Sequence, residues 1–257
     1  MLKCDNLFSR EHLIWIGVLA LGFLLPACFT LRVFRGPGDP EAGVRVRWHG
    51  HSCFTIEDST GRQFLLDPFN DEAVGYRLAW TNPDAVLVTH EHFDHTYLER
   101  TTGYELLKST GVHTVAGVEV SGFLADHDDE GGRRHGTTRF YVWEMGGLCL
   151  ATLGDMGQTV LRPDQREALK GVDILFLPVG GKTTVDGAQA AALVKAIGPR
   201  AVVPMHYGNK KVRFHEFDRI DAFLSFFRNV KILPSSEFQF RRGNQTNAPT
   251  VYVPKIP

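Results

Sequence analysis

Thr89-His90-Glu91-His92-Phe93-Asp94-His95 concentrates three imidazoles and the Asp94 carboxylate within six residues. Neutral imidazole and carboxylate are the ligands that suit Zn²⁺ and neighbouring divalent ions. His90 and His92, two residues apart in an extended loop, can face one ion, and Asp94 and His95 then face a second. The stretch therefore predicts two half-sites for metal, whereas a polar loop that is merely rich in histidine is the alternative.

Three further residues with ligand chemistry share one structural position, because each follows an apolar, strand-like run. His127 follows 122–125, Asp155 follows 148–153 and His206 follows 201–205, just as His90 follows 85–89. Taken singly, such residues are more often surface or core histidines and turn aspartates. Ligands at strand ends converge on one sheet edge, so the joint pattern favours a single metal site.

These motifs give the chain a resemblance to a known family. It resembles the metallo-β-lactamase superfamily, and within it the ascorbate-6-phosphate lactonase-like hydrolases. Besides His-x-His-x-Asp-His, the resemblance rests on Trp48-His49-Gly50-His51-Ser52-Cys53-Phe54, Leu66-Asp67-Pro68-Phe69, His127-Asp128-Asp129-Glu130-Gly131, Leu153-Gly154-Asp155, Pro178-Val179-Gly180-Gly181 with Thr184-Val185-Asp186, and Pro204-Met205-His206-Tyr207-Gly208.

The resemblance implies an α/β fold, a four-layer αββα sandwich with the metals at one edge of its two sheets. It also implies a ligand set: His90, His92 and His127 on one ion, Asp94, His95 and His206 on the other, and Asp155 bridging them. Two divalent ions are expected, zinc first, with manganese or iron also compatible. True β-lactamases of this fold typically carry cysteine where Asp155 stands. Relatives often read His-Leu-Gly-Asp, whereas this chain has Thr152 at the first position.

Dinuclear chemistry explains why these residues are needed. Two cations lower the pKa of a shared water, so a metal-bound hydroxide exists near neutral pH and attacks the substrate. Asp155 and Asp94 are then the catalytic carboxylates, and a lactone, ester or phosphodiester of small-molecule or lipid-derived origin is the expected substrate. A diiron redox protein is disfavoured because such members typically carry glutamate at the position of His92. A catalytically silent binding protein is disfavoured because all seven ligand positions are filled.

Four residues are candidates for supporting or substrate-contacting roles. Asp67 can hold an imidazole in the correct tautomer, although a turn aspartate before Pro68 is equally expected. His51 and Ser52 match a family motif near the metals, and Lys182 can meet an anionic substrate group. A structural role for the first two and a solvated lysine are the alternatives.

Composition describes an ordinary globular domain. Hydrophobic residues make up 43% and charged residues 22% of the 257 residues. Lys and Arg total 28 against 29 Asp and Glu, so no basic field draws the chain to nucleic acid. The cysteines, Cys4, Cys28, Cys53 and Cys149, lack the paired spacing of a disulfide framework or a zinc finger. Nothing in the sequence sets the oligomeric state.

The N-terminus is a different kind of sequence. Residues 13–31 form an uncharged run of nineteen residues, just long enough to cross a bilayer, and its densest part, 13–25, has the length of a signal-peptide core. Leu25-Pro26-Ala27-Cys28 resembles a lipobox. We therefore expect a membrane or signal segment over 1–35, a linker over 36–43 and a catalytic domain over 44–257. Residues 12–34 would hold the chain at the membrane, as a lipoprotein or a single-pass helix with the domain on the exported side, unless signal cleavage releases it.

The domain itself shows an alternating α/β pattern. Strands are expected over 44–48, 53–56, 64–66 and 172–178, with a hairpin of 140–143 and 148–153. Helices are expected over 95–108, 188–197 and 216–227, and a last edge strand over 251–253.

Overall fold

The computed structural model describes residues 38–243 and 248–257. The segment expected to be a signal or membrane anchor, and the first residues of the linker, lie outside these ranges. Among the described residues, no helix has the length and apolar character that crossing a membrane requires.

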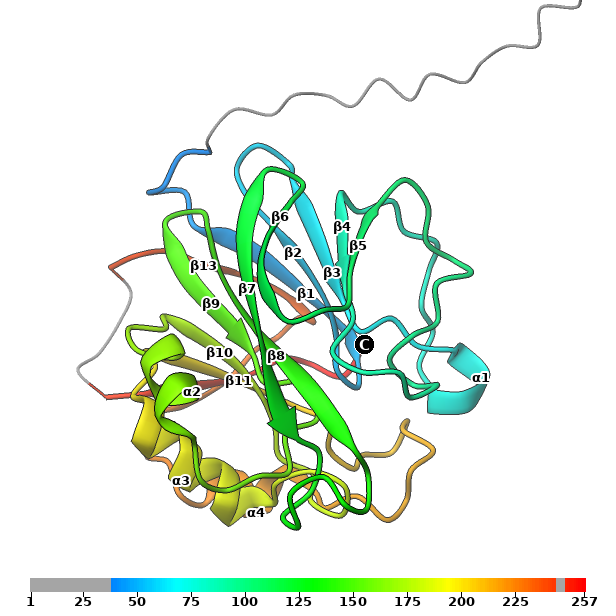
Figure 1. The fold of residues 1–257 in the computed structure, drawn as a ribbon, viewed down its shortest axis with the longest axis vertical. Helices are drawn as coiled ribbons and strands as arrows, with labels where there is room; N and C mark the ends of the chain where they lie inside the picture. Colours follow the sequence, from blue (N-terminus) through cyan, green and yellow to red (C-terminus); the bar gives the residue numbers. More distant parts are fainter. Residues whose placement is uncertain (1–37, 244–247) are drawn as a thin grey trace, which may run out of the picture. The chain divides into compact units, whose positions relative to one another are not determined.

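Fourteen strands within the described residues form two mixed sheets (Figure 1). The six-stranded sheet runs in the order β13 (Glu237–Phe240), β1 (Val44–Gly50), β2 (Cys53–Glu57), β3 (Gln63–Leu66), β4 (Ala85–Leu87) and β5 (Glu105–Leu107). The strands from β13 to β3 pair antiparallel, whereas β3, β4 and β5 are parallel. In β1, Val44, Val46 and Trp48 are buried while Arg45 and Arg47 are exposed, as the sequence alternation predicts.

The eight-stranded sheet carries most of the parallel pairing. Its order is β12 (Val230–Ile232), β14 (Thr250–Val253), β11 (Ala201–Met205), β10 (Ile174–Pro178), β9 (Leu148–Thr152), β8 (Thr137–Met145), β7 (Val118–Asp126) and β6 (Gly111–Val115). Strands from β12 to β9 are parallel and those from β9 to β6 antiparallel. All five residues of β10 and of β11 are buried, as expected for central parallel strands.

One apolar core joins the two sheets. It contains Trp48, Phe54 and Phe64 from the first sheet and Trp143 and Phe176 from the second. The rings of Phe54 and Phe176 have centroids 4.7 Å apart, so side chains of facing sheets interlock. The structure is thus an α/β sandwich whose sheets fix the strand ends relative to one another.

The helices are short and only partly match expectation. They are α1 (Asp71–Val74), α2 (Pro163–Ala168), α3 (Gly187–Ile197) and α4 (Ile220–Leu224), and Figure 1 shows α2, α3 and α4 gathered beside β10 and β11. The helix expected over 188–197 is confirmed as α3, which Asp186 caps and Gly198 ends in the left-handed conformation. Val74, in the single turn of α1, belongs to a second apolar cluster with Leu65 of β3 and Val86 of β4.

Two predicted helices were wrong in whole or in part. The span 95–108 is irregular and ends in β5, because its backbone bonds to other segments: Tyr97 N–H donates to the Pro68 carbonyl and Thr102 N–H to that of Thr81. The helix expected over 216–227 shrinks to α4, since Asp218 N–H donates to the Gly180 carbonyl and its own carbonyl accepts from Gly208. The strand at 251–253 is interior as part of β14, because β12 forms the edge.

Candidate metal centre

The histidine-rich loop, residues 89–95, follows β4 and is held by a carboxylate at the end of β3. Asp67 accepts hydrogen bonds of 2.8 Å from both the backbone N–H and the hydroxyl of Thr89. The Thr89 hydroxyl proton is thereby committed, so its oxygen, 3.0 Å from His90 Nδ1, accepts from that nitrogen. His90 Nε2 is left unprotonated and faces the cluster described next, which is what a metal ligand requires.

The first cluster contains His90, His92 and His127, whose ligand atoms all lie within 4.8 Å of one another. His127 follows β7, and its Nδ1 lies 2.9 Å from the carbonyl oxygen of Thr183. A carbonyl only accepts, so Nδ1 carries the proton and Nε2 presents a lone pair. His90 and His127 are buried and His92 is exposed, so the cluster opens to solvent on one side.

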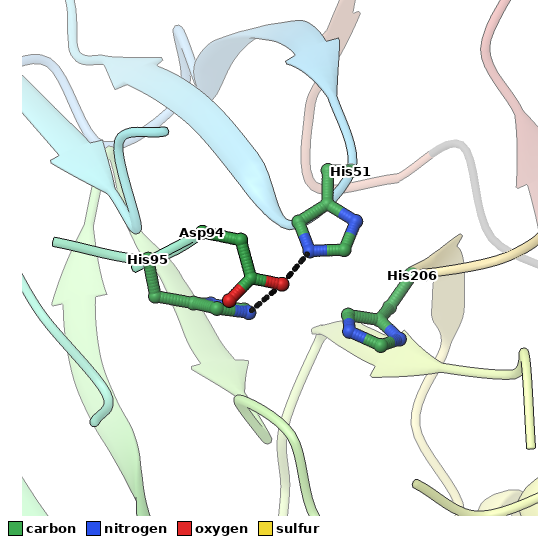
Figure 2. A group of neighbouring side chains, drawn as sticks. All are labelled: His51, Asp94, His95 and His206. Atoms are coloured by element: carbon green, nitrogen blue, oxygen red, sulfur yellow. Dashed lines mark hydrogen bonds and ion pairs between the residues drawn. The ribbon is translucent and has the colours of Figure 1, made fainter. Parts of the chain in front are cut away.

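The second cluster contains His51, Asp94, His95 and His206, all buried and within the same 4.8 Å limit (Figure 2). His51 Nε2 lies 3.1 Å and His95 Nε2 3.7 Å from Asp94 Oδ2. Sequence reasoning gave His51 only a supporting or substrate-contacting place, whereas the structure groups it with the expected ligands.

His51 and His206 reach this cluster because their strands end in tight turns. Both residues have φ of 52°, in the left-handed region that is uncommon for non-glycine residues. The His51 carbonyl accepts hydrogen bonds from the Trp48 indole, at 3.0 Å, and from the His206 backbone N–H, at 3.4 Å. The end of β1 is thus tied directly to the end of β11. A Cβ at Gly180 would lie 2.1 Å from the His206 carbonyl oxygen, so glycine is required there.

Asp155, after β9, lies between the two clusters. Its Oδ2 is 2.9 Å from Nε2 of His206, 3.3 Å from that of His95, 3.6 Å from that of His127 and 3.8 Å from that of His90. One carboxylate oxygen therefore reaches residues of both clusters.

Burial and mutual proximity set the protonation of these groups. Burial and then His95 lower the pKa of His90 to about 2, and burial and then His206 lower that of His51 to about 4. Burial alone raises the pKa of Asp155, but His206 and His95 outweigh it and hold the pKa well below its usual range. His95 is the exception: burial lowers its pKa, but Asp155 and Asp94 raise it well above the usual value. A bound cation would displace that proton.

The unpaired polar atoms of the site test whether metal fits. Among the described residues, His95 Nε2, His127 Nε2 and Asp155 Oδ1 are buried without a hydrogen-bond partner. Such atoms are costly to bury unless something else pairs with them. Because these are imidazole nitrogens and carboxylate oxygens converging on one place, divalent ions are the partners that fit.

The remaining candidates lie around the two clusters. Asp67 Oδ2 is 3.1 Å from His95 Nδ1 in addition to holding Thr89. Ser52 is buried beside His51, and its hydroxyl has no hydrogen-bond partner among the described residues. Lys182 is exposed, with φ of 63°, and lines a polar cavity of about 240 Å³ together with Thr183, the residue that orients His127.

Sequence reasoning missed Asp128 as a supporting residue. Its carboxylate accepts four backbone N–H groups, those of Glu130, Gly132, Arg134 and His135, at 2.8–2.9 Å. Burial alone raises the pKa of Asp128, but the bonds from His135 and Arg134 outweigh it and hold the pKa below its usual range. An aspartate followed by the glycines 131 and 132 is a turn signal that would have pointed to this role.

Comparison with known proteins agrees with this geometry. A family model described as a β-lactamase superfamily domain matches residues 45–206. The chain is 33% identical over 187 residues to a UPF0173 protein of Pyrococcus furiosus, covering 64% of this chain and 84% of the relative. It is 30% identical over 216 residues to a UPF0173 metal-dependent hydrolase of Thermoplasma volcanium, covering 73% and 91%.

A solved structure extends the likeness over most of the chain. A Thermotoga maritima protein described as a Zn-dependent hydrolase of the metallo-β-lactamase superfamily superposes with a TM-score of 0.67. The two sequences are 27% identical, and the match covers 82% of this chain and 97% of the other.

Proposed function

The chain belongs to the metallo-β-lactamase superfamily, within its UPF0173 metal-dependent hydrolase family, and on that premise we propose that it hydrolyses a lactone, ester or phosphodiester at a dinuclear metal site. The observation that carries this proposal is the position of Asp155, one oxygen of which lies within 3.8 Å of imidazoles from both clusters. Membership of the ascorbate-6-phosphate lactonase-like group within the superfamily is part of the proposal.

The two clusters divide the ligands. His90, His92 and His127 would hold one ion, and Asp94, His95 and His206 would hold the other, with His51 beside the second set as the hydrogen-bond partner of Asp94. Asp155, which lies between the two clusters, would be the ligand that they share. Zinc suits this mixture of imidazole and carboxylate best. When bound, the two ions generate a nucleophile from water near neutral pH, polarise the scissile group and stabilise the leaving oxygen.

The chain's own residues position these groups. Thr89 and Thr183 fix the tautomers of His90 and His127, so both present unprotonated Nε2 atoms. His51 donates toward Asp94 and orients that carboxylate. Asp155 Oδ1 is buried and has no hydrogen-bond partner among the described residues, so it would be free to accept a hydrogen bond from a water held by the ions.

We propose further that residues 12–34 keep the chain at the membrane, with the domain on the exported side, and that the substrate is a small or lipid-derived molecule. The support is the uncharged apolar run 13–31 followed by a linker of turn-forming residues. No nucleic acid is expected as a partner, because the net charge is −1.

Turnover on a panel of chromogenic esters, lactones and phosphodiesters tests the hydrolase assignment. Asp155→Ala is expected to lower kcat on the best substrate by at least about a hundredfold, while the thermal midpoint changes far less in proportion. Asp164→Asn, an exposed acid in α2, is the matched control. Activity of Asp155→Ala within a few fold of wild type would refute the assigned bridge.

A further inference from the structure

Three phenylalanine rings form a continuous path from solvent to the second cluster. Phe93 and Phe214 have ring centroids 6.2 Å apart, and Phe214 and Phe217 5.1 Å apart. The Phe217 ring lies 4.5 Å from that of His206, and the Phe214 ring 5.5 Å from that of His51. We call Phe93, Phe214 and Phe217 the aromatic ladder.

Exposure increases outward along the ladder. Phe217 is buried at 8% exposed, Phe214 is intermediate and Phe93 is 61% exposed. Phe93 stands between His92 and Asp94 in the histidine-rich loop, so an exposed apolar ring is fixed between two proposed ligands. A large exposed aromatic side chain at such a position indicates a binding surface.

Backbone hydrogen bonds hold the segment that carries Phe214 and Phe217. Phe217 N–H donates to the Phe214 carbonyl at 3.4 Å, and Arg213 N–H donates to the Val74 carbonyl at 3.0 Å. Gly208 N–H donates to Asp218 at 2.9 Å. The two ends of segment 208–218 are therefore joined to each other and its middle is tied to α1, so the backbone that carries Phe214 and Phe217 is fixed before any ligand binds.

We propose that the aromatic ladder binds an apolar group, alkyl or aromatic, attached to the scissile bond of the substrate. This inference rests on the proposed function, because the clusters must hold the scissile group for its substituent to reach the ladder. The rings of Phe217 and Phe214 directly contact His206 and His51, so whatever occupies the second cluster has an apolar surface beside it. The substrate class is thereby narrowed to apolar esters, lactones or phosphodiesters.

Binding of two hydroxamates to the zinc-replete full-length protein, measured by titration calorimetry, tests the ladder without relying on turnover. Acetohydroxamate and octanohydroxamate share a metal-chelating head group and differ in alkyl length. Each buried methylene is worth about fourfold in a dissociation constant, so octanohydroxamate should bind at least about tenfold more tightly. Phe93→Ser and Phe214→Ala should each reduce that ratio to below about threefold.

Phe226→Ser is the matched control, because Phe226 is 57% exposed and belongs to no part of the site. Phe226→Ser should keep the wild-type ratio of affinities for the two hydroxamates. An unchanged ratio would also show that the longer alkyl chain does not simply adhere to exposed apolar side chains. Equal affinity for both probes in wild type, or an unchanged ratio in Phe93→Ser, would overturn the ladder while leaving the metal site intact. If the protein takes up no zinc and neither probe binds, the proposed function itself would be overturned.

Self-association is the competing explanation for an exposed Phe93. A wild-type dimer that Phe93→Ser converts to a monomer in sedimentation, with the hydroxamate ratio unchanged, would assign the ring to contact between copies and overturn the proposal.

Discussion

Hydrogen bonds from single side chains determine which imidazole nitrogen of this site presents its lone pair to the metal clusters. Thr89 is the example: its hydroxyl proton goes to Asp67, so its oxygen is left to accept from His90. Sequence reasoning placed Asp67 near the imidazoles from its motif alone, but the route through Thr89 depends on the register between β3 and β4. The same limit explains His51, whose place in the second cluster depends on a turn at positive φ that no residue pattern specifies.

Removing the Asp67 carboxylate should weaken metal binding although no proposed metal ligand is substituted. Asp67→Ala is expected to lower affinity for zinc by about 10- to 100-fold, measured by competition with a chromophoric chelator. Asp58→Ala is the control, since Asp58 is another buried carboxylate that accepts backbone N–H groups, in the turn between β2 and β3. Equal losses of affinity in both variants would show that Asp67 acts only on folding.

The reactivity of the Cys149 thiol tests the fold around β9. Burial, then Asp173 and Glu144, raise the pKa of its thiol to about 11, so the reactive thiolate is scarce below that pH. Iodoacetamide at pH 8.5 should therefore label Cys149 slowly in the native protein and rapidly in guanidinium, as read by peptide mass mapping. Rapid native labelling would mean that β9 is more open than described.

At the scale of elements, sequence patterns succeeded where a segment buries its own apolar face. The alternation in β1 and the helix over 188–197 were predicted correctly for that reason. Sequence patterns failed where the backbone forms hydrogen bonds with a distant segment. In the span 95–108, Tyr97 bonds to residue 68 and Thr102 to residue 81. Asp218, just before α4, bonds to the turn at 180 and to Gly208 in the loop after β11, so the local helical pattern was overridden.

The conformation of the loop after β7 depends on one hydrogen-bond acceptor, the Asp128 carboxylate. Asp128→Ala leaves four backbone N–H groups without their partner, so amide exchange at Gly132, Arg134 and His135 should accelerate by roughly tenfold or more. Asp129→Ala is the matched control, because Asp129 is exposed and its carboxylate accepts, among the described residues, only from the Arg134 side chain. Similar exchange in both variants would contradict the role given to Asp128.

At the scale of the whole molecule, two sheets meet at one core and carry the ligand-bearing strand ends to one place. That convergence was predictable, because each candidate ligand follows an apolar run. The substrate was not predictable, because the proposed binding surface lies partly on loop 208–218, whose course follows from long-range hydrogen bonds.

The N-terminal segment gives a prediction about location. The full-length chain should remain with the membrane fraction, and deletion of residues 1–35 should release an active domain, since either a lipid-embedded helix or a diacylated Cys28 anchors firmly. Loss of lipid labelling in Cys28→Ser would identify a lipoprotein, and membrane retention without labelling a transmembrane helix. Wild-type protein found entirely in the soluble fraction would contradict both.

The central claim is that the two clusters form a dinuclear metal site. Elemental analysis of the purified, metal-replete full-length protein tests it most directly. The arrangement of His90, His92 and His127 on one side of Asp155, and of Asp94, His95 and His206 on the other, predicts two divalent ions per chain. A content of one ion or fewer would contradict the dinuclear site and the chemistry proposed for it.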